Sequence, residues 1–152
     1  MRPTGDRVRE AWFSIVQFDV PNARVVDLCA GSGALGIEAL SRGAVHVTFV
    51  DSSAAALAAI QKNLASLSAN ATQYTLHLGD ALAFVSGMPA NTFTIGFADP
   101  PYAHGVAAGL GEAWRRTHFA TVLGVEHLAS LDMGDGGDRR RYGQTAITFF
   151  RG

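Results

Sequence analysis

Apolar and polar residues along the chain repeat in turn at the periods of strands and of helices. Continuous or alternating apolar runs predict strands at 24–29, 45–50, 74–78, 92–98, 121–125 and 146–150. Apolar faces at helical spacing predict an opening helix before the Pro21-Asn22 break and later helices at about 35–43, 53–66, 81–85 and 107–116. Strands that alternate with helices in this order predict an α/β fold, with a mainly parallel sheet covered on both faces.

The two ends of the chain carry less regular patterns. Thr4 can cap the opening helix, whose apolar face includes Val8 and Trp12. The segment 128–138 is rich in glycine and aspartate and shows no period, so we expect a loop there. The basic run 139–141 is of a kind that is most often a solvated face, and contact with phosphate is the alternative.

Composition limits the possible classes of protein. The 152 residues fit one domain, 1–152, and 48% hydrophobic with 16% charged residues excludes intrinsic disorder. No apolar run approaches the roughly 18 residues of a membrane span and no signal peptide opens the chain, so we expect a cytoplasmic protein. The single cysteine, Cys29, and the scattered histidines predict no disulfide and no metal site. A net charge of −1 argues against a broad basic surface for naked nucleic acid.

A glycine-rich turn follows the first predicted strand. Residues 30–36, Ala-Gly-Ser-Gly-Ala-Leu-Gly, contain the G-x-G-x-x-G spacing between a strand and a helix. Asp51 ends the next strand, about 20 residues on, where a carboxylate can accept hydrogen bonds from ribose hydroxyls. NAD and S-adenosylmethionine both carry a ribose, so Asp51 does not distinguish the two cofactors.

Asp27 favours one of these cofactors. It ends the first strand beside the turn, where its charge would repel the pyrophosphate of a dinucleotide. S-adenosylmethionine instead presents an ammonium and a sulfonium, and a carboxylate within about 4–6 Å of such cations is favourable. We therefore predict S-adenosylmethionine as the cofactor.

A further acid, Asp80, ends the third strand. It can hold an adenine amino group beside the backbone of Ala81, and the alternative is that it caps the following helix. The predicted cofactor-binding residues are Asp27, Ala30, Gly31, Ser32, Gly33, Asp51, Ser52, Asp80 and Ala81.

The fourth strand runs into Asp99-Pro100-Pro101-Tyr102, the predicted catalytic residues. Two prolines fix the backbone and make the turn stiff. The Asp99 carboxylate and the Pro100 carbonyl can accept both N–H bonds of a nucleobase amine and turn its lone pair toward a methyl group. Tyr102 can stack on a single-stranded or flipped-out base. A turn that Asp99 merely caps is the alternative, but Asp99 and Asp27 are expected at the same edge of the sheet.

Several strings in the chain, taken together, match one family. They are 2–10, beginning Arg2-Pro3-Thr4, then 27–44, beginning Asp27-Leu28-Cys29-Ala30-Gly31, then Asp99-Pro100-Pro101-Tyr102 and finally Tyr142-Gly143-Gln144-Thr145. In these strings the chain resembles the bacterial 16S rRNA guanine-N2 methyltransferase family, over nearly its whole length. Members of that family usually begin with a short basic segment ahead of the first string, and this sequence starts almost at that string.

The resemblance implies both a fold and a function. It implies a class I methyltransferase fold, a Rossmann-like three-layer sandwich whose last strand is antiparallel, with S-adenosylmethionine as cofactor. It implies a guanine of 16S rRNA as substrate, within a small ribosomal subunit or an assembly intermediate, and we expect a monomer. The residues leave two alternatives open, an adenine-N6 DNA methyltransferase and a non-catalytic S-adenosylmethionine-binding module.

Three further residues lie where they could meet a substrate. His104 follows the Asp-Pro-Pro-Tyr turn closely, and Glu126-His127 ends the fifth strand. We expect this pair to face the same edge of the sheet as Asp99.

Overall fold

The structure is a computed structural model that describes residues 5–102 and 105–152. Thr4 and His104 lie outside the described residues. The helices are α1 (Gly5–Val16), α2 (Ala34–Ser41), α3 (Ala54–Ser66), the 3-10 turn η1 (Ala71–Gln73), α4 (Ala81–Val85) and α5 (Val106–Thr117). The strands are β1 (Arg24–Leu28), β2 (His46–Asp51), β3 (Tyr74–Leu78), β4 (Phe93–Ala98), β5 (Ala120–Leu128), β6 (Asp138–Tyr142) and β7 (Thr145–Arg151).

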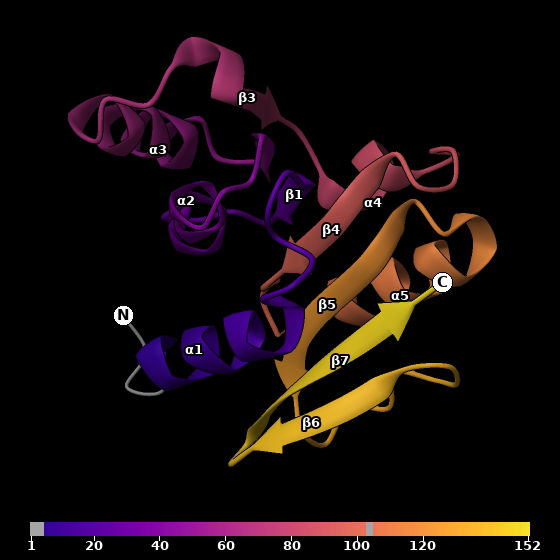
Figure 1. Cartoon of the computed structure of the whole chain (residues 1–152). Coiled ribbons are helices and arrows are strands. Elements are labelled where there is room, and N and C mark those ends of the chain that lie inside the picture. Colours follow the sequence, from indigo (N-terminus) through magenta and orange to yellow (C-terminus); the bar gives the residue numbers. More distant parts are fainter. Residues whose placement is uncertain (1–4, 103–104) are drawn as a thin grey trace.

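All the strands belong to one sheet in the order β3-β2-β1-β4-β5-β7-β6 (Figure 1). The strands β3, β2, β1, β4 and β5 each pair with their neighbours in parallel. The strand β7 is antiparallel to both β5 and β6. The predicted parallel sheet and its antiparallel last strand are confirmed. Because parallel strands end at the same edge, the residues that follow β1 to β5 meet along one edge, which we call the rim.

Helices cover both faces of the sheet and divide the core into two clusters. On one face α1, α2 and α3 pack against the strands, and the ring of Trp12 in α1 meets the rings of Phe97 and Phe149 edge-on. On the other face α4 and α5 cover the sheet. No helix in the part of the chain that the structure describes is long and apolar enough to cross a membrane.

The opening helix ends at Val16, ahead of Pro21 as predicted, and a turn follows it at 17–19. The C-terminal part of the sequence differs from the prediction. The expected loop and basic run contain an additional edge strand, β6, with the sequence Asp-Arg-Arg-Arg-Tyr. Charged residues on an edge strand protect it against pairing with other chains, and they also hide the alternation by which a strand is predicted.

Candidate active site

Four carboxylates gather at the rim from four successive strands. Asp27 lies in β1, Asp51 ends β2, and the other two, Asp80 and Asp99, follow β3 and β4. Their charges act together on Cys29, which lies among them: burial chiefly, and then all four carboxylates, raise the pKa of the Cys29 thiol to about 12. The rim is therefore negatively charged, which favours a cationic ligand and opposes a pyrophosphate.

The glycine turn needs glycine at its positions for different reasons. Gly31 and Gly33 have φ angles of +56° and +79°, a left-handed conformation that is costly for other residues. A Cβ atom on Gly31 would meet nothing within 4 Å, so this side of the turn is open to a ligand. A Cβ atom on Gly36 would overlap the ring of Phe49, so here glycine allows α2 to approach β2 closely.

Asp27 and Asp51 hold the glycine turn by hydrogen bonds. Asp27 Oδ2 accepts the N–H of Gly36 at 3.0 Å, and Asp51 Oδ2 accepts the N–H of Gly31 at 2.9 Å. Asp51 Oδ1 also accepts the N–H of Ser53, at 2.9 Å, so one carboxylate orders both segments. The sequence predicted these two acids as ligand-binding groups, and their role in shaping the turn was missed.

Asp27 is the most buried member of the acidic group. Its side chain is 2% exposed. Burial raises the pKa of Asp27 well above its usual range, the hydrogen bond from Gly36 opposes this rise, and the charges of Asp99 and Asp51 add to it. Ionised Asp27 is therefore costly in the protein alone, and a cation at the rim would relieve that cost.

The remaining predicted cofactor-binding residues lie along the same rim. Asp80 Oδ2 accepts the N–H of Ala83 at 2.9 Å, which confirms that it caps α4, although a carboxylate can accept further hydrogen bonds. Ala30 is buried and its N–H donates to the Val50 carbonyl at 2.9 Å. Ser32 and Ser52 are exposed, and Ala81 begins α4 as a buried residue.

The Asp-Pro-Pro-Tyr turn borders its own cavity of about 280 Å³, lined by Asp99, Pro100, Pro101 and Tyr102. Pro100 is buried, Asp99 is half-buried, and the Tyr102 side chain is 43% exposed. β4 pairs directly with β1, with Phe97 opposite Asp27, so this cavity and the glycine turn share one edge of the sheet as predicted.

The hydroxyl group of Tyr102 reaches two residues of the C-terminal strands. It lies 3.0 Å from Oγ1 of Thr145 in β7, and it donates to Oε2 of Glu126 in β5 at 3.5 Å. Glu126 is 4% exposed. Thr145 belongs to the string Tyr142-Gly143-Gln144-Thr145 that was singled out in the sequence, but its contact with Tyr102 was missed because 43 positions separate the two residues. The polar contacts hold the Tyr102 ring at the edge of the cavity.

Glu126 and His127 do not act as a pair at the rim. Successive residues of a strand point to opposite faces, and His127 lies in the core at 1% exposure. Its Nδ1 and Nε2 lie 2.8 Å from the Leu128 carbonyl and 2.7 Å from Thr148 Oγ1, and burial lowers its pKa. The expectation that His127 faces the rim is wrong. Across residues 5–102 and 105–152, no group of three or more potential metal ligands is placed to hold a metal ion.

Comparisons with known proteins agree with this arrangement. The family described as "Conserved hypothetical protein 95" matches residues 1–151. A stretch of 108 residues, 70% of this chain, is 40% identical to "Ribosomal RNA small subunit methyltransferase D" of Escherichia coli (strain K12) and covers 52% of that protein. This chain thus matches about half the length of that relative.

Two solved structures are similar over most of their length. "Putative methyltransferase yhhF" from Escherichia coli has a TM-score of 0.83 at 29% identity, covering 98% of this chain and 86% of that chain. "Putative methylase HI0767" from Haemophilus influenzae has a TM-score of 0.80 at 27% identity and covers 97% of each chain. The class I methyltransferase fold implied by the resemblance is confirmed.

Proposed function

Because the chain belongs to the family described as "Conserved hypothetical protein 95" and gathers four carboxylates at the rim, we propose that it is an S-adenosylmethionine-dependent methyltransferase. The proposed acceptor is the N2 amino group of a guanine in 16S rRNA. The relative from Escherichia coli is named as a small-subunit ribosomal RNA methyltransferase, which supports RNA as the substrate. The observation that carries the proposal is the gathering of Asp27, Asp51, Asp80 and Asp99 beside the glycine turn.

The residues at the rim fit S-adenosylmethionine better than a dinucleotide. Four carboxylates lie near Cys29 at the start of the turn, so a donor with an ammonium and a sulfonium is attracted where a pyrophosphate is repelled. Gly31 leaves the space beside the turn open. Asp51 would accept hydrogen bonds from the ribose hydroxyls with its remaining acceptor capacity. Asp80 and the backbone of Ala81 would hold the adenine. The remaining contacts would come from Ala30, Ser32, Gly33 and Ser52.

The Asp-Pro-Pro-Tyr cavity would hold the guanine. The Asp99 carboxylate and the Pro100 carbonyl would accept the two N–H bonds of N2, and the stiff proline turn fixes both acceptors before the base arrives. The exposed face of Tyr102 would stack on the base, and its hydroxyl is already held by Thr145. A guanine inside a duplex cannot reach this cavity, so we infer that the target base is single-stranded or flipped out.

Alignment of the amine accounts for catalysis without a strong base. When bound, S-adenosylmethionine supplies an electrophilic methyl group on a positively charged sulfur. The lone pair of N2 is delocalised into the ring, and acceptors at both N–H bonds turn it out of the base plane. The nitrogen bonds to the methyl carbon as the carbon–sulfur bond breaks, and the surplus proton leaves N2 to Asp99 or to water. Positioning of this kind can lower a barrier by about 7–11 kcal/mol.

The net charge of −1 favours a substrate that is already assembled with protein. We therefore propose that the substrate is the small ribosomal subunit or an assembly intermediate. We also propose that the protein acts as a monomer in the cytoplasm. In a folded particle the shape of the surface around the target base can be recognised. Binding would then need only local contacts with this chain and no broad basic surface.

Label transfer tests the proposal directly. The protein is incubated with tritiated S-adenosylmethionine and small ribosomal subunits that lack their methyl groups, and the labelled nucleoside is identified after digestion. We expect label on guanine N2. Asp99→Ala should abolish transfer by removing one acceptor of the amine, while donor affinity measured by calorimetry stays nearly unchanged.

Other outcomes would replace the proposal. Label on adenine N6 of DNA would make the protein a DNA methyltransferase, and tight donor binding without transfer to either nucleic acid would make it a binding module. Tight binding of NAD with no response to S-adenosylmethionine would overturn the cofactor assignment.

A further inference from the structure

The arginines of β6 face opposite sides of the sheet. Arg139 pairs with Thr148 and Arg140 pairs with Ile147 of β7. Paired residues of antiparallel strands point to the same side. Thr148 pairs with Val125 of the α5-face cluster, so Arg139 lies on the α5 face, and Arg140 lies on the α1 face, with Ile147. Arg141, two positions after Arg139, shares its face and lies closer to the rim. The three arginines of the basic run therefore contribute to two separate surfaces, with Arg139 and Arg141 on one and Arg140 on the other.

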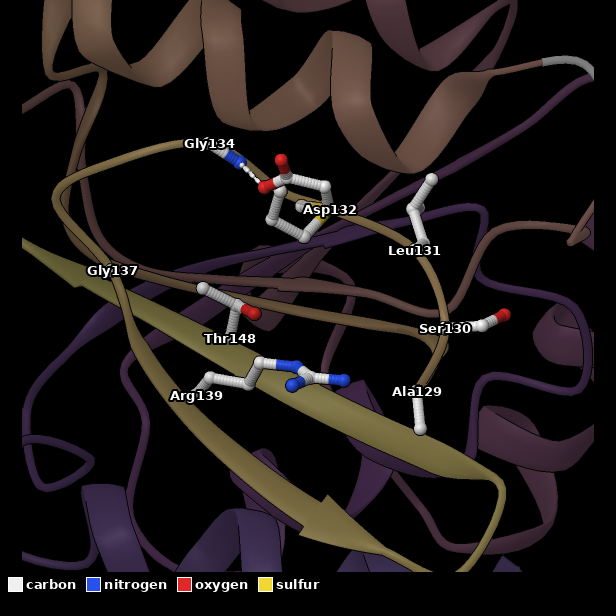
Figure 2. A pocket seen from close by; sticks show the side chains of 9 residues that line it. Ala129, Ser130, Leu131, Asp132, Gly134, Gly137, Arg139 and Thr148 are labelled. Atoms are coloured by element: carbon white, nitrogen blue, oxygen red, sulfur yellow. Dashed lines mark hydrogen bonds between the residues drawn. The ribbon is translucent and has the colours of Figure 1, made fainter.

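On the α5 face, Arg139 borders a cavity of about 280 Å³. Figure 2 shows its guanidinium extending beside Thr148 and across the cavity toward Ala129 and Ser130. The opposite wall is the segment 129–134, which directly follows β5. The cavity is thus lined by the exposed guanidinium of Arg139 on one side. On the other side it is lined by hydroxyl and backbone groups of the loop 129–134, which begins at the rim.

Arg139 and Arg140 differ in their partners. Arg140 forms an ion pair with Asp138 at 2.9 Å, and Arg151 in the neighbouring cavity on the α1 face pairs with Asp19 at 3.0 Å. Within the described parts of the chain, the Arg139 side chain has no hydrogen bond or ion pair. Its charge is thus available for a ligand.

The other charged side chains around this cavity form hydrogen bonds within the loop 129–135 or to it. Asp132, the acidic residue of the lining, accepts the N–H of Gly134 at 2.8 Å. Arg115 in α5 donates to the carbonyls of Met133 and Asp135, each at 3.1 Å, and brings a second positive charge beneath the loop. The loop is ordered by these contacts, so the wall opposite Arg139 exists before any ligand arrives.

The cavity lies in line with the Asp-Pro-Pro-Tyr turn across the sheet. Ala98, the residue before Asp99, pairs with Val125, Val125 pairs with Thr148, and Thr148 pairs with Arg139. Three strand spacings of about 4.8 Å place Arg139 about 14 Å from β4 at the same level. Tyr102 contacts Glu126 and Thr145, which lie on the α1 face with Ile147. A nucleic-acid strand whose base enters the Asp-Pro-Pro-Tyr cavity can therefore reach this arginine by crossing the rim to the α5 face.

We propose that Arg139, assisted by Arg141, binds a phosphodiester of the RNA strand that flanks the target guanine. The inference rests on the proposed function, because the base fixes where the strand starts. A planar guanidinium matches two oxygens of a phosphate, and such charge-assisted contacts are strong. If the arginines only protected the edge strand, the charges of Arg139 and Arg140 would be equivalent.

A pair of matched variants separates these roles. Arg139→Gln and Arg140→Gln each remove one positive charge from the same strand, on opposite faces. Binding of a short fluorescein-labelled single-stranded RNA that contains guanine is followed by fluorescence anisotropy over a series of salt concentrations. We expect Arg139→Gln to weaken binding about tenfold and to reduce the slope of log affinity against log salt by about 0.7. Arg140→Gln should leave both quantities unchanged.

The two variants are also compared in thermal unfolding, in donor binding and in label transfer. Arg139→Gln should raise KM for RNA without changing kcat, and neither variant should alter melting or donor affinity. Equal losses of RNA binding in both variants, or no loss in either, would overturn the inference. Equal KM values for small ribosomal subunits in the wild type and in Arg139→Gln would overturn it as well. If Arg139→Gln alone weakens RNA binding while the wild type transfers no label, the phosphate site stands and the proposed function fails.

Discussion

The glycine turn and the Asp-Pro-Pro-Tyr turn lie on the same rim but are held in different ways. The glycine turn is fixed from inside, because buried Asp27 and the end of β2 accept its N–H groups. The Asp-Pro-Pro-Tyr turn is stiff through its prolines and is tied to the rest of the sheet by Tyr102, whose hydroxyl meets Glu126 and Thr145. The glycine turn is thus held by hydrogen bonds to acids of the central strands β1 and β2, one of them buried. The Asp-Pro-Pro-Tyr turn is held by the contacts of one exposed side chain with β5 and β7.

This difference predicts how each turn responds to change. Asp27 is 2% exposed, so a substitution that disturbs its surroundings alters folding and ligand binding together. Tyr102 is 43% exposed, so its loss costs the protein little packing. Substitutions in the glycine turn should therefore lower stability, whereas those in the Asp-Pro-Pro-Tyr turn should lower activity in a protein that remains folded.

The largest effect is expected from Gly36→Ala. Alanine normally stabilises a helix interior, but here its Cβ would overlap the Phe49 ring and lie 2.9 Å from Val47 Cγ1. We expect the free energy of unfolding to fall by about 3 kcal/mol, measured by chemical denaturation. Gly31→Ala is the matched control, since its Cβ meets nothing and only its φ of +56° is strained, at about 1 kcal/mol. Equal losses in both variants would contradict the close approach of α2 and β2.

Asp27→Asn should separate the two roles of this residue. Its folded pKa is raised well above 3.8, mainly by burial. The unfolded chain therefore releases its proton at lower pH than the folded protein, and the wild type loses stability as pH rises through that window. Asparagine keeps an acceptor for Gly36 without a charge, so the variant should lack this loss in pH-dependent denaturation. Donor affinity should fall about tenfold, because the carboxylate no longer attracts the cation.

A variant with unchanged donor affinity would show that Asp27 serves only the turn. If the stability of the wild type relative to Asp27→Asn does not fall as pH rises through the same window, burial is not the cause of the raised pKa of Asp27. Asp51→Asn provides the comparison for donor affinity, because Asp51 is half-buried at the end of β2 and likewise accepts an N–H of the glycine turn.

The parts of the fold that depend on neighbouring residues could be predicted from the sequence. The strand 24–28, the turn at Gly31 and the helix 34–41 follow one another within a few residues, and local spacing is enough to recognise them. The rule that parallel strands end at one edge then placed Asp99 beside Asp27.

Features that depend on distant parts of the chain could not be predicted. The strand β6 has no apolar alternation, because it pairs at an edge and its side chains are charged. The contact of Tyr102 with Thr145 depends on how β7 turns back along β5, which no local pattern specifies. The role of Asp27 in the turn was missed because a hydrogen bond to Gly36 requires knowing where α2 begins.

The smallest effect, and the sharpest test of the comparison, is expected from Thr145→Val. Valine keeps the shape of threonine but removes the hydroxyl that lies 3.0 Å from the Tyr102 hydroxyl. Thr145 is half-buried and begins β7, so the free energy of unfolding should hardly change. The Tyr102 ring becomes less well placed for the base, and kcat/KM for RNA should fall a few-fold in label-transfer kinetics, with donor affinity unchanged. Thr145→Ser keeps the hydroxyl and should retain wild-type kinetics. If serine and valine reduce kcat/KM equally, β7 supports the turn by packing, and the hydrogen bond does not position Tyr102.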